Sequence, residues 1–425
     1  MAISLDQPAK PCISSTLAAN ELINQMRTDG IDVAHMAFGQ APFPAPQRLV
    51  NALRDHAGEK GYMPTSGLPE LRQAVADHHA LHTNVDMSSY DVVIGPGSKV
   101  MLFALQMAIP GDLLLPIPTW VSYEPQARLL GQQIIPVPTT VSDDGYTIDV
   151  AAIDSALTDA RSAGLNPTKL LINFPNNPTG LSIDDDTMSA LVEICRKRKL
   201  VLISDEIYGR LSYDHSYRSA ASNYPEGAVV TTGLSKHLSL GGWRLGVCLV
   251  PKSIDGLFER LCHIASETWS CVAAPIQVAA IDGYVGHADI EQFIRDTTDI
   301  HATVNRYVAT SLRSLGADCP MPQGAFYTWP DFGKVLSGSL ESSEQLADTL
   351  LEKYKVAALS GRVFGEKSEV LKLRLSACDY DGGKALEGWH AMNISDDTQG
   401  KVEQIAPNVV AAMRAFELFI GDYVE

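Results

Sequence analysis

Short apolar runs alternate with longer, helix-like patterns between residues 46 and 300, and this alternation constrains the fold more than any other feature. Runs such as LLINFP, LVLISDEIY and LGVCLVP are typical of buried strands in a mostly parallel sheet that helices cover on both faces. Each run ends in Gly, Pro, Asn or Asp, so turns and polar side chains gather where open α/β sheets bind ligands. We therefore expect a large α/β domain with its site at that edge of the sheet.

The remaining chain predicts a second, smaller unit. The runs AFYTWPDF, VAALSG and VLKLRLSA read as strands. Four apolar residues line one face of a final helix that begins near Pro407: Val409, Met413, Phe416 and Ile420. Because 425 residues exceed what one hydrophobic core usually supports, two domains are expected. We predict a large domain over 46–300, a smaller α+β domain over 301–425, and an arm over 1–45 that forms part of the small domain.

Charge and cysteine content argue against several classes of protein. The formal net charge is −17, with 33 basic and 50 acidic side chains, whereas a nucleic-acid binder normally shows a basic face. The seven cysteines contain no CxxC pair, so neither a disulfide framework nor a zinc site is indicated, and the cytoplasm fits best. No apolar run approaches the roughly 20 residues that span a bilayer, and the start of the chain does not resemble a secretion signal. We expect no membrane or nucleic-acid partner.

One lysine stands in a neighbourhood suited to a phosphorylated aldehyde. Lys236 follows Ser235 in TTGLSKHLSLGGWRLG, and Arg244 comes eight positions later (244 − 236 = 8). A desolvated lysine can lose its proton and form a Schiff base, whereas the guanidinium of arginine stays charged. Lys236 is therefore a candidate Schiff-base lysine, with Ser235 and Arg244 as phosphate partners. A surface lysine in a glycine-rich loop is the alternative.

Two further strand ends suit the same ligand. Gly97, Ser98 and Lys99 form a turn between a strand and a helix, where backbone N–H groups and the helix dipole favour phosphate. Trp120 directly follows a strand, and its flat face could stack on an aromatic ring. The alternatives are an ordinary helix cap for the turn and core packing for the tryptophan.

The segments NFPNNPTG and SDEIYGRL predict polar groups around a ring. The first is a rigid, proline-rich turn in which a fixed asparagine amide can donate to a phenolate-type oxygen. The second ends a strand with Asp205 and Glu206, and Tyr208 follows. A carboxylate there could keep a ring nitrogen protonated, while the tyrosine hydroxyl reaches a ring oxygen. An ordinary turn and a helix cap are the alternatives.

Arg374 lies in the run VLKLRLSA, where alternation places it on the strand face opposite Leu371, Leu373 and Leu375. A guanidinium fixed on a strand can bind a carboxylate through two parallel hydrogen bonds. A solvent-exposed arginine is the alternative.

The stretch HHALH offers His78, His79 and His82, a conceivable metal pair on a helix. No carboxylate or cysteine stands at matching spacing. We therefore expect a solvated helix face and no metal site.

Taken in this order, the segments resemble the class I and II aminotransferases of fold type I, which depend on pyridoxal 5′-phosphate (PLP), from about residue 30 to the end. The resemblance implies that Lys236 forms the internal aldimine with PLP and that Asp205 pairs with the pyridine nitrogen. Trp120 would stack on the ring. It also implies phosphate, ring-oxygen and substrate contacts for the other candidates: Gly97, Ser98, Lys99, Ser235 and Arg244 for the phosphate, Tyr208 and Asn177 for the ring oxygen, and Gly39, Asn177 and Arg374 for the substrate, with Arg374 on its α-carboxylate.

The resemblance further implies a homodimer with shared active sites, since Tyr62 matches a tyrosine that reaches the phosphate of the neighbouring subunit. Members of the family move an amino group from an L-amino acid to a 2-oxo acid by a ping-pong mechanism, with the freed lysine moving a proton at the substrate α-carbon. Two alternatives remain open: a PLP-dependent lyase, synthase or oxidase on the same fold, and a transcription regulator with an aminotransferase-like domain.

Three departures from the family pattern limit what can be carried over. The loop AFGQAPFP sets its proline one place later than is common, and Gly233 stands where some relatives place a phosphate-binding serine or threonine. The polar stretch 378–401 replaces a brief connection, and we hypothesise a substrate-covering or interface segment there. The segment CHIASETWSCVAAP contains no arginine for a second carboxylate, so aspartate specificity is not supported.

Overall fold

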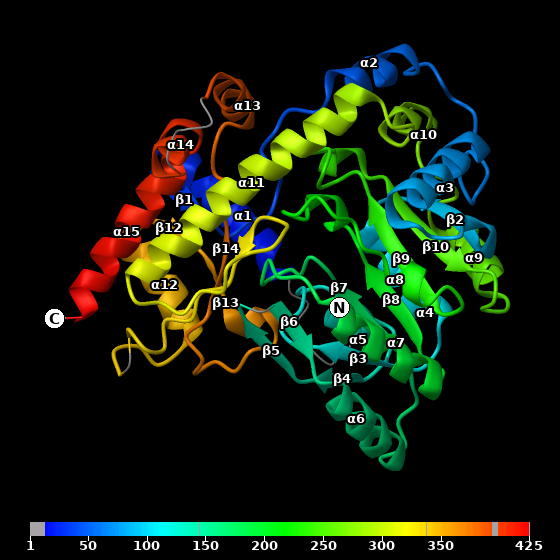
Figure 1. Ribbon diagram of the computed structural model, residues 1–425, viewed down its shortest axis with the longest axis horizontal. Helices are drawn as coiled ribbons and strands as arrows, with labels where there is room; N and C mark the ends of the chain where they lie inside the picture. The colour runs from blue at the N-terminus through cyan, green and yellow to red at the C-terminus, as the bar shows by residue number, and fades with distance from the viewer. Residues whose placement is uncertain (1–12, 144, 337, 393–397, 425) are drawn as a thin grey trace, which may run out of the picture.

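The computed structural model describes residues 13–143, 145–336, 338–392 and 398–424 (Figure 1). A seven-stranded sheet forms the centre of the larger part, in the order β2-β10-β9-β8-β7-β3-β4. Only β10 runs antiparallel to its neighbours, so the predicted mostly parallel sheet is confirmed. The strands are β2 (Tyr90–Gly95), β3 (Asp112–Pro116), β4 (Ile134–Val137), β7 (Pro167–Asn173), β8 (Val201–Asp205), β9 (Ala228–Gly233) and β10 (Gly246–Pro251).

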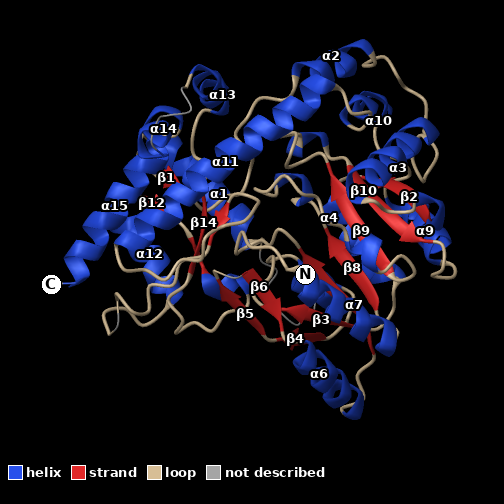
Figure 2. Ribbon diagram, viewed as in Figure 1, coloured by secondary structure: helices blue, strands red, loops and turns tan. Residues whose placement is uncertain are grey.

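Helices cover both faces of this sheet, which explains its continuous apolar runs (Figure 2). Leu113 and Leu115 of β3 point to one face, while Leu114 between them joins the hydrophobic cluster on the other. The first face carries α4 (Ser98–Ala108), α5 (Tyr123–Leu129) and α9 (Leu257–Thr268), and the second carries α6 (Val150–Ser162), α7 (Asp185–Arg198) and α8 (Ala220–Asn223). A further cluster holds α2 (Gln47–Asp55), α3 (Pro69–Thr83) and α10 (Ala274–Ala280) against β2 and β10, while β5 (Thr139–Ser142) and β6 (Gly145–Ile148) form a separate hairpin.

The C-terminal part has its own small sheet, which confirms the predicted strands there. It has the order β11-β14-β13, and β1 near the N-terminus pairs in parallel with β12. All four predicted apolar residues of the last helix are buried. The elements are β1 (Ala34–His35), β11 (Tyr327–Thr328), β12 (Val356–Ala357), β13 (Leu359–Ser360), β14 (Leu373–Ser376), α1 (Ser15–Thr28), α12 (Ser343–Tyr354), α13 (Gly382–Ala391), α14 (Thr398–Ile405) and α15 (Pro407–Val424).

A single 27-residue helix, α11 (Ala288–Ser314), joins the two parts. Ile290 and Ile294 pack in the cluster of the large sheet, whereas Val304 and Val308 pack in the C-terminal cluster. The boundary near residue 300 therefore falls inside a continuous helix, and the division into domains stays a prediction.

The histidine-rich face of α3 is buried, so the predicted solvated helix face is wrong. His78 and His79 are 5% and 1% exposed, because Tyr284 and Tyr217 from later parts of the chain pack against their rings. Burial lowers the pKa of both histidines, that of His79 to about 4, which favours neutral rings. Among the described residues, no group of three or more acidic, histidine or cysteine side chains could hold a metal ion.

The polar stretch 378–401 is not a long structureless loop. Most of it forms α13 and the start of α14, and residues 393–397 lie outside the described part. His390 of α13 bonds to Asp296 of α11, and a Cβ on Gly382 would lie 2.4 Å from the carbonyl oxygen of Pro42. The stretch thus packs beside α11. None of its described residues lines the cavity described below, so the structure gives no support to a substrate-covering role within one chain.

Helices long and apolar enough to cross a membrane are absent from the described ranges.

Candidate active site

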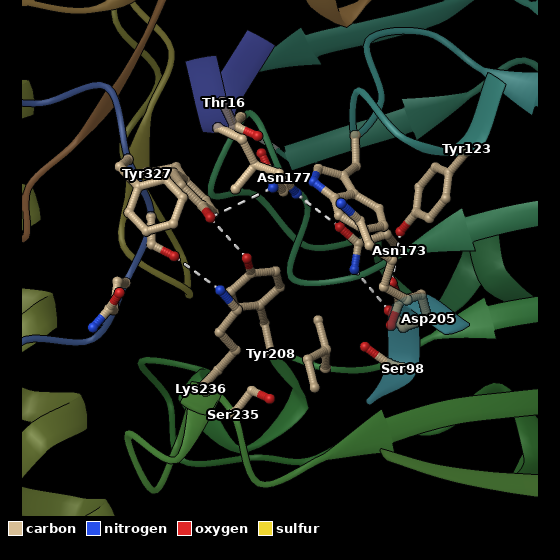
Figure 3. A pocket seen from close by; sticks show the side chains of 18 of the residues that line it. Thr16, Ser98, Tyr123, Asn173, Asn177, Asp205, Tyr208, Ser235, Lys236 and Tyr327 are labelled. Carbon is tan, nitrogen blue, oxygen red and sulfur yellow. Dashed lines mark hydrogen bonds between the residues drawn. The ribbon is translucent and has the colours of Figure 1, made fainter. Parts of the chain in front are cut away.

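A cavity of about 270 Å³ opens at the carboxyl ends of β7, β8 and β9, where the C-terminal part meets the large sheet (Figure 3). It brings together eleven of the thirteen residues predicted for the site: Gly39, Ser98, Lys99, Trp120, Asn177, Asp205, Tyr208, Ser235, Lys236, Arg244 and Arg374. Gly97 lies directly behind Arg244. Tyr62 does not line the cavity of its own chain, and its side chain is 94% exposed.

Lys236 follows the end of β9 and points into the cavity. Its Nζ donates a 2.8 Å hydrogen bond to the carbonyl oxygen of Gly39 and lies 5.5 and 5.4 Å from the ring centres of Tyr208 and Phe326. Burial lowers the pKa of Lys236 from 10.5 to about 8. A usable fraction of the amine is therefore unprotonated near neutral pH, as a lysine that attacks an aldehyde requires.

Asp205 ends β8 on the floor of the cavity. The hydroxyl of Tyr123 donates to one carboxyl oxygen at 2.8 Å, and that of Thr231 donates to the other at 3.2 Å. Burial raises the pKa of Asp205 to about 6, and these hydrogen bonds limit the rise. At neutral pH the carboxylate is ionised and held in one orientation, ready for a positively charged partner.

The turn before α4 forms one end of the cavity. Gly97 has a φ of +90°, and a Cβ there would lie 2.1 Å from a terminal nitrogen of Arg244. Gly246 of β10 packs directly against the backbone of this turn, since a Cβ there would lie 2.5 Å from the backbone nitrogen of Ser98. The first N–H groups of α4 thus meet the guanidinium of Arg244 at this end. Such an arrangement suits an anion.

Gly233 is confined by the backbone beside it. A Cβ there would lie 2.6 Å from the carbonyl oxygen of Leu245, on the neighbouring strand β10. A side chain at this position would require the backbone of β10 to shift. The close packing of β9 against β10 therefore depends on this glycine.

Trp120 lines the cavity after β3, and two contacts fix its indole. Tyr123 meets it edge-on at 5.1 Å, and the Nζ of Lys99 lies 5.2 Å from its ring centre. Burial lowers the pKa of Lys99. The tryptophan is thus not simply core packing, because it presents part of its surface to the cavity.

Asn177 is fixed by the turn NFPNNPTG after β7. Its backbone N–H donates to the side chain of Asn173 at 2.9 Å, and Asn173 in turn donates to the carbonyl oxygen of Asp205 at 2.7 Å. The peptide bond between Phe174 and Pro175 is cis. The turn therefore joins the ends of β7 and β8 and fixes the backbone of Asn177 at the cavity.

Arg374 of β14 is 1% exposed, so the solvent-exposed alternative is excluded. Its guanidinium donates to the carbonyl oxygen of Ala37 and, at 3.2 Å, to the side-chain oxygen of Asn177. The rings of Tyr327 and Phe364 lie 4.8 and 5.0 Å from the guanidinium carbon. Its Nε has no hydrogen-bond partner among the described residues, which leaves a buried donor available to a carboxylate.

Several cavity residues were not predicted from the sequence. Tyr327 bonds to Tyr208 through the two hydroxyl groups at 2.7 Å, and Tyr123 holds Asp205. Asn173 stands in the same proline-rich segment as Asn177, so that segment did carry a signal for it. The N-terminal part of the chain supplies four uncharged residues to the cavity: Thr16, Leu17, Phe38 and Gln40.

The cavity concentrates positive charge within an acidic protein. Four cationic side chains line it against the single carboxylate of Asp205: Lys99, Lys236, Arg244 and Arg374. The chain as a whole has a net charge of −17. A ligand with one phosphate and one carboxylate would balance this excess. The unpartnered Nε of Arg374, the glycine cradle beside Arg244 and the pKa of Lys236 all fit PLP together with an amino acid.

Comparison with solved structures identifies the fold. The chain superposes on the aspartate aminotransferase of Thermus thermophilus with maleate at a TM-score of 0.80 and 24% identity, covering 95% of this chain and 96% of the other. It superposes on the alanine aminotransferase of Pyrococcus furiosus at 0.82 and 22%, covering 98% and 100%. The architecture is that of the fold type I, PLP-dependent enzymes.

Comparison of sequences identifies the family. The model of the family "Aminotransferase class I and II" matches residues 31–382. A probable aspartate/prephenate aminotransferase of Aquifex aeolicus is 30% identical over 364 residues, which cover 83% of this chain and 89% of the relative. An aspartate aminotransferase of Bacillus sp. (strain YM-2) is 29% identical over 84% and 91%. This chain belongs to the class I and II aminotransferases and is a PLP-dependent enzyme.

Proposed function

We propose that the chain transfers an amino group between an L-amino acid and a 2-oxo acid in a ping-pong reaction, with PLP attached to Lys236. The observation that carries this proposal is the position of a half-buried lysine amine between an acid, an anion-binding turn and a buried arginine. PLP would supply a ring that accepts electrons from the substrate α-carbon. The chain's own residues would place the substrate and move the proton.

We assign each end of the cavity by its charge. The N–H groups at the start of α4, with Ser235, Lys99 and Arg244, would bind the phosphate. Asp205 would hold the ring nitrogen in its protonated form, while Tyr208 and Asn177 would donate to the ring oxygen. Trp120 would pack against the ring face. These roles are supported by the positions of the side chains around one cavity.

Arg374 and Lys236 would act on the substrate. The buried guanidinium would bind the α-carboxylate through donors that include its unpartnered Nε, which orients the α-carbon. Once released from the cofactor, the Nζ of Lys236 would remove the α-proton and return it on the cofactor side. The lowered pKa of this amine, about 8, suits a base that works near neutral pH.

The decisive experiment is reduction with borohydride, which locks an imine between a lysine and the cofactor. Wild type should give one modified peptide that contains Lys236, and it should yield one equivalent of 2-oxo acid when given an amino acid alone. Lys236→Ala should lose the link and nearly all turnover. A link that persists in Lys236→Ala would refute the assignment, and continuous turnover without an acceptor would show a different reaction.

For the substrate, we propose an amino acid without a second carboxylate. The N-terminal residues that line the cavity are uncharged, and the segment CHIASETWSCVAAP contains no arginine. Relatives bear names that specify aspartate, prephenate or alanine, so the family alone does not select one. A screen of amino donors against pyruvate and 2-oxoglutarate tests the proposal, and a clear preference for aspartate would refute it.

We further propose a homodimer that works in the cytoplasm. Support for the dimer comes from Tyr62, a large aromatic side chain that stands 94% exposed outside its own cavity. Light scattering measures the mass, and a monomer would contradict the proposal. A reducing compartment is supported by the six described cysteines, all of which are free thiols.

A further inference from the structure

The hydroxyl of Tyr327 occupies a central place among the polar groups of the cavity (Figure 3). It lies 2.7 Å from the hydroxyl oxygen of Tyr208 and 3.4 Å from the side-chain nitrogen of Asn177. These are the two residues assigned above to the ring oxygen of the cofactor. Tyr327 itself belongs to β11 in the small sheet, so it links that sheet to the ligands carried by the large one.

Arg374 sets the orientation of the Asn177 amide. A guanidinium can only donate, so the Asn177 oxygen faces Arg374 and its NH₂ group faces Tyr327. The oxygen of Tyr327 then accepts from Asn177, and its single proton is available for Tyr208. Either hydroxyl of this pair can be the donor. With Tyr327 as the donor, the proton of Tyr208 points into the cavity. In that arrangement, hydrogen bonds are donated in one direction from Arg374 through Asn177 and Tyr327 to Tyr208.

The surroundings hold the hydroxyl of Tyr327 in this place. The side chain is 1% exposed, and Arg374 covers one face of its ring at 4.8 Å. On another side, a Cβ on Gly39 would lie 2.1 Å from the hydroxyl oxygen. Burial raises the pKa of Tyr327 to about 12, so the proton stays on the hydroxyl at neutral pH.

We propose that Tyr327 is a positioning residue, whose hydroxyl turns the proton of Tyr208 toward the ring oxygen of the cofactor and holds the amide of Asn177 beside it. It acts through these two side chains rather than on the substrate. The proposal rests on the assignment of PLP to Lys236.

The consequence is measurable in the absorbance of the bound cofactor. A hydrogen bond donated to the ring oxygen favours the form in which that oxygen carries a full negative charge, which is the form whose imine nitrogen has lost its proton. Without the Tyr327 hydroxyl, the Tyr208 proton is free to turn away and this bond weakens. Tyr327→Phe should therefore raise the pH midpoint of the absorbance titration by roughly one unit.

A double-mutant cycle separates positioning from a general structural effect. Tyr208→Phe alone should also raise the midpoint, because it removes the donor itself. In that background, Tyr327→Phe should add less than half of its effect in wild type. Equal shifts in both backgrounds, or no shift in wild type, would overturn the proposal.

Two further variants serve as a control and as a substitute for Tyr327→Phe. Tyr224→Phe removes another buried tyrosine hydroxyl, which donates to the carbonyl oxygen of Leu200 away from the cavity, and it should leave the midpoint unchanged. If Tyr327→Phe does not fold, Gly39→Ala displaces the same hydroxyl and should shift the midpoint in the same direction. The absence of a reducible cofactor in wild type would refute the proposed function, whereas a normal wild type with an unshifted Tyr327→Phe would refute only the present inference.

Discussion

Replacing Lys236 with methionine should stabilise the cofactor-free protein, and the gain should depend on pH. Burial lowers the pKa of Lys236 from 10.5 to about 8 in the folded state, so folding at neutral pH keeps a charge where it is disfavoured. At pH 7 this penalty is about 3 kcal/mol in the free energy of unfolding, from 1.36 kcal/mol per pKa unit. Methionine has a similar volume and no charge, so it avoids the penalty.

The stability gained by Lys236→Met decreases as the pH rises. A lowered folded pKa means that the unfolded chain binds more protons between pH 8 and 10.5, so the stability of wild type rises through this window and falls as the pH drops toward 8. By pH 9.5 the penalty has shrunk to about 1.4 kcal/mol. The hydrogen bond to Gly39, worth about 1 kcal/mol, is lost at every pH and offsets part of the gain.

Urea denaturation of the cofactor-free proteins at pH 7 and pH 9.5 measures the effect. The advantage of Lys236→Met over wild type should decrease by about 2 kcal/mol between the two pH values. Lys334→Met is the matched control, since the Lys334 side chain is 82% exposed, and it should show no such change. An advantage that stays constant with pH, or grows toward pH 9.5, would refute the reasoning.

Two other changes test the ends of the cavity. Gly97→Ala places a methyl group 2.1 Å from Arg244 at a φ of +90°. The dissociation constant of PLP should therefore rise by at least about tenfold. Gly242→Ala is the control: its methyl group meets nothing within 4 Å, so the dissociation constant should stay unchanged. Tyr123→Phe removes a donor to Asp205 and should raise the pKa of that carboxyl further above 6. The acidic limb of PLP affinity against pH should then move upward by about one unit, and an unmoved limb would show that Tyr123 does not tune the acid.

The sequence allowed much of the fold and site to be predicted because the relevant signals are local. Strands buried on both faces read as apolar runs, and the polar residues that end them, such as Asp205 and Asn177, lie at the same sheet edge. Lys236 and Arg244 share one short segment, and Gly97 marks a strand-to-helix turn. Each of these residues could be placed from its immediate neighbours.

The features that were missed depend on contacts between distant segments. Nothing near Tyr327 shows that its hydroxyl meets Tyr208, 119 residues away. The face of α3 looked polar and solvated, but tyrosines from beyond residue 200 cover His78 and His79. The stretch 378–401 looked like a loop because its helices have few apolar residues, yet α11 supplies a surface for them. Partners of this kind cannot be read from local periodicity.

The pairing of β1 with β12 has a consequence for the order of events during synthesis. Ala34 joins Val356, and the cavity then combines Gly39 with Arg374, which the ribosome adds 335 residues later (374 − 39 = 335). The strands of the large sheet are all available once Pro251 has emerged, more than a hundred residues before the arginine. A nascent chain can therefore assemble its scaffold early, while its N-terminal segment waits for a partner. The cavity can be completed only after Arg374 has emerged.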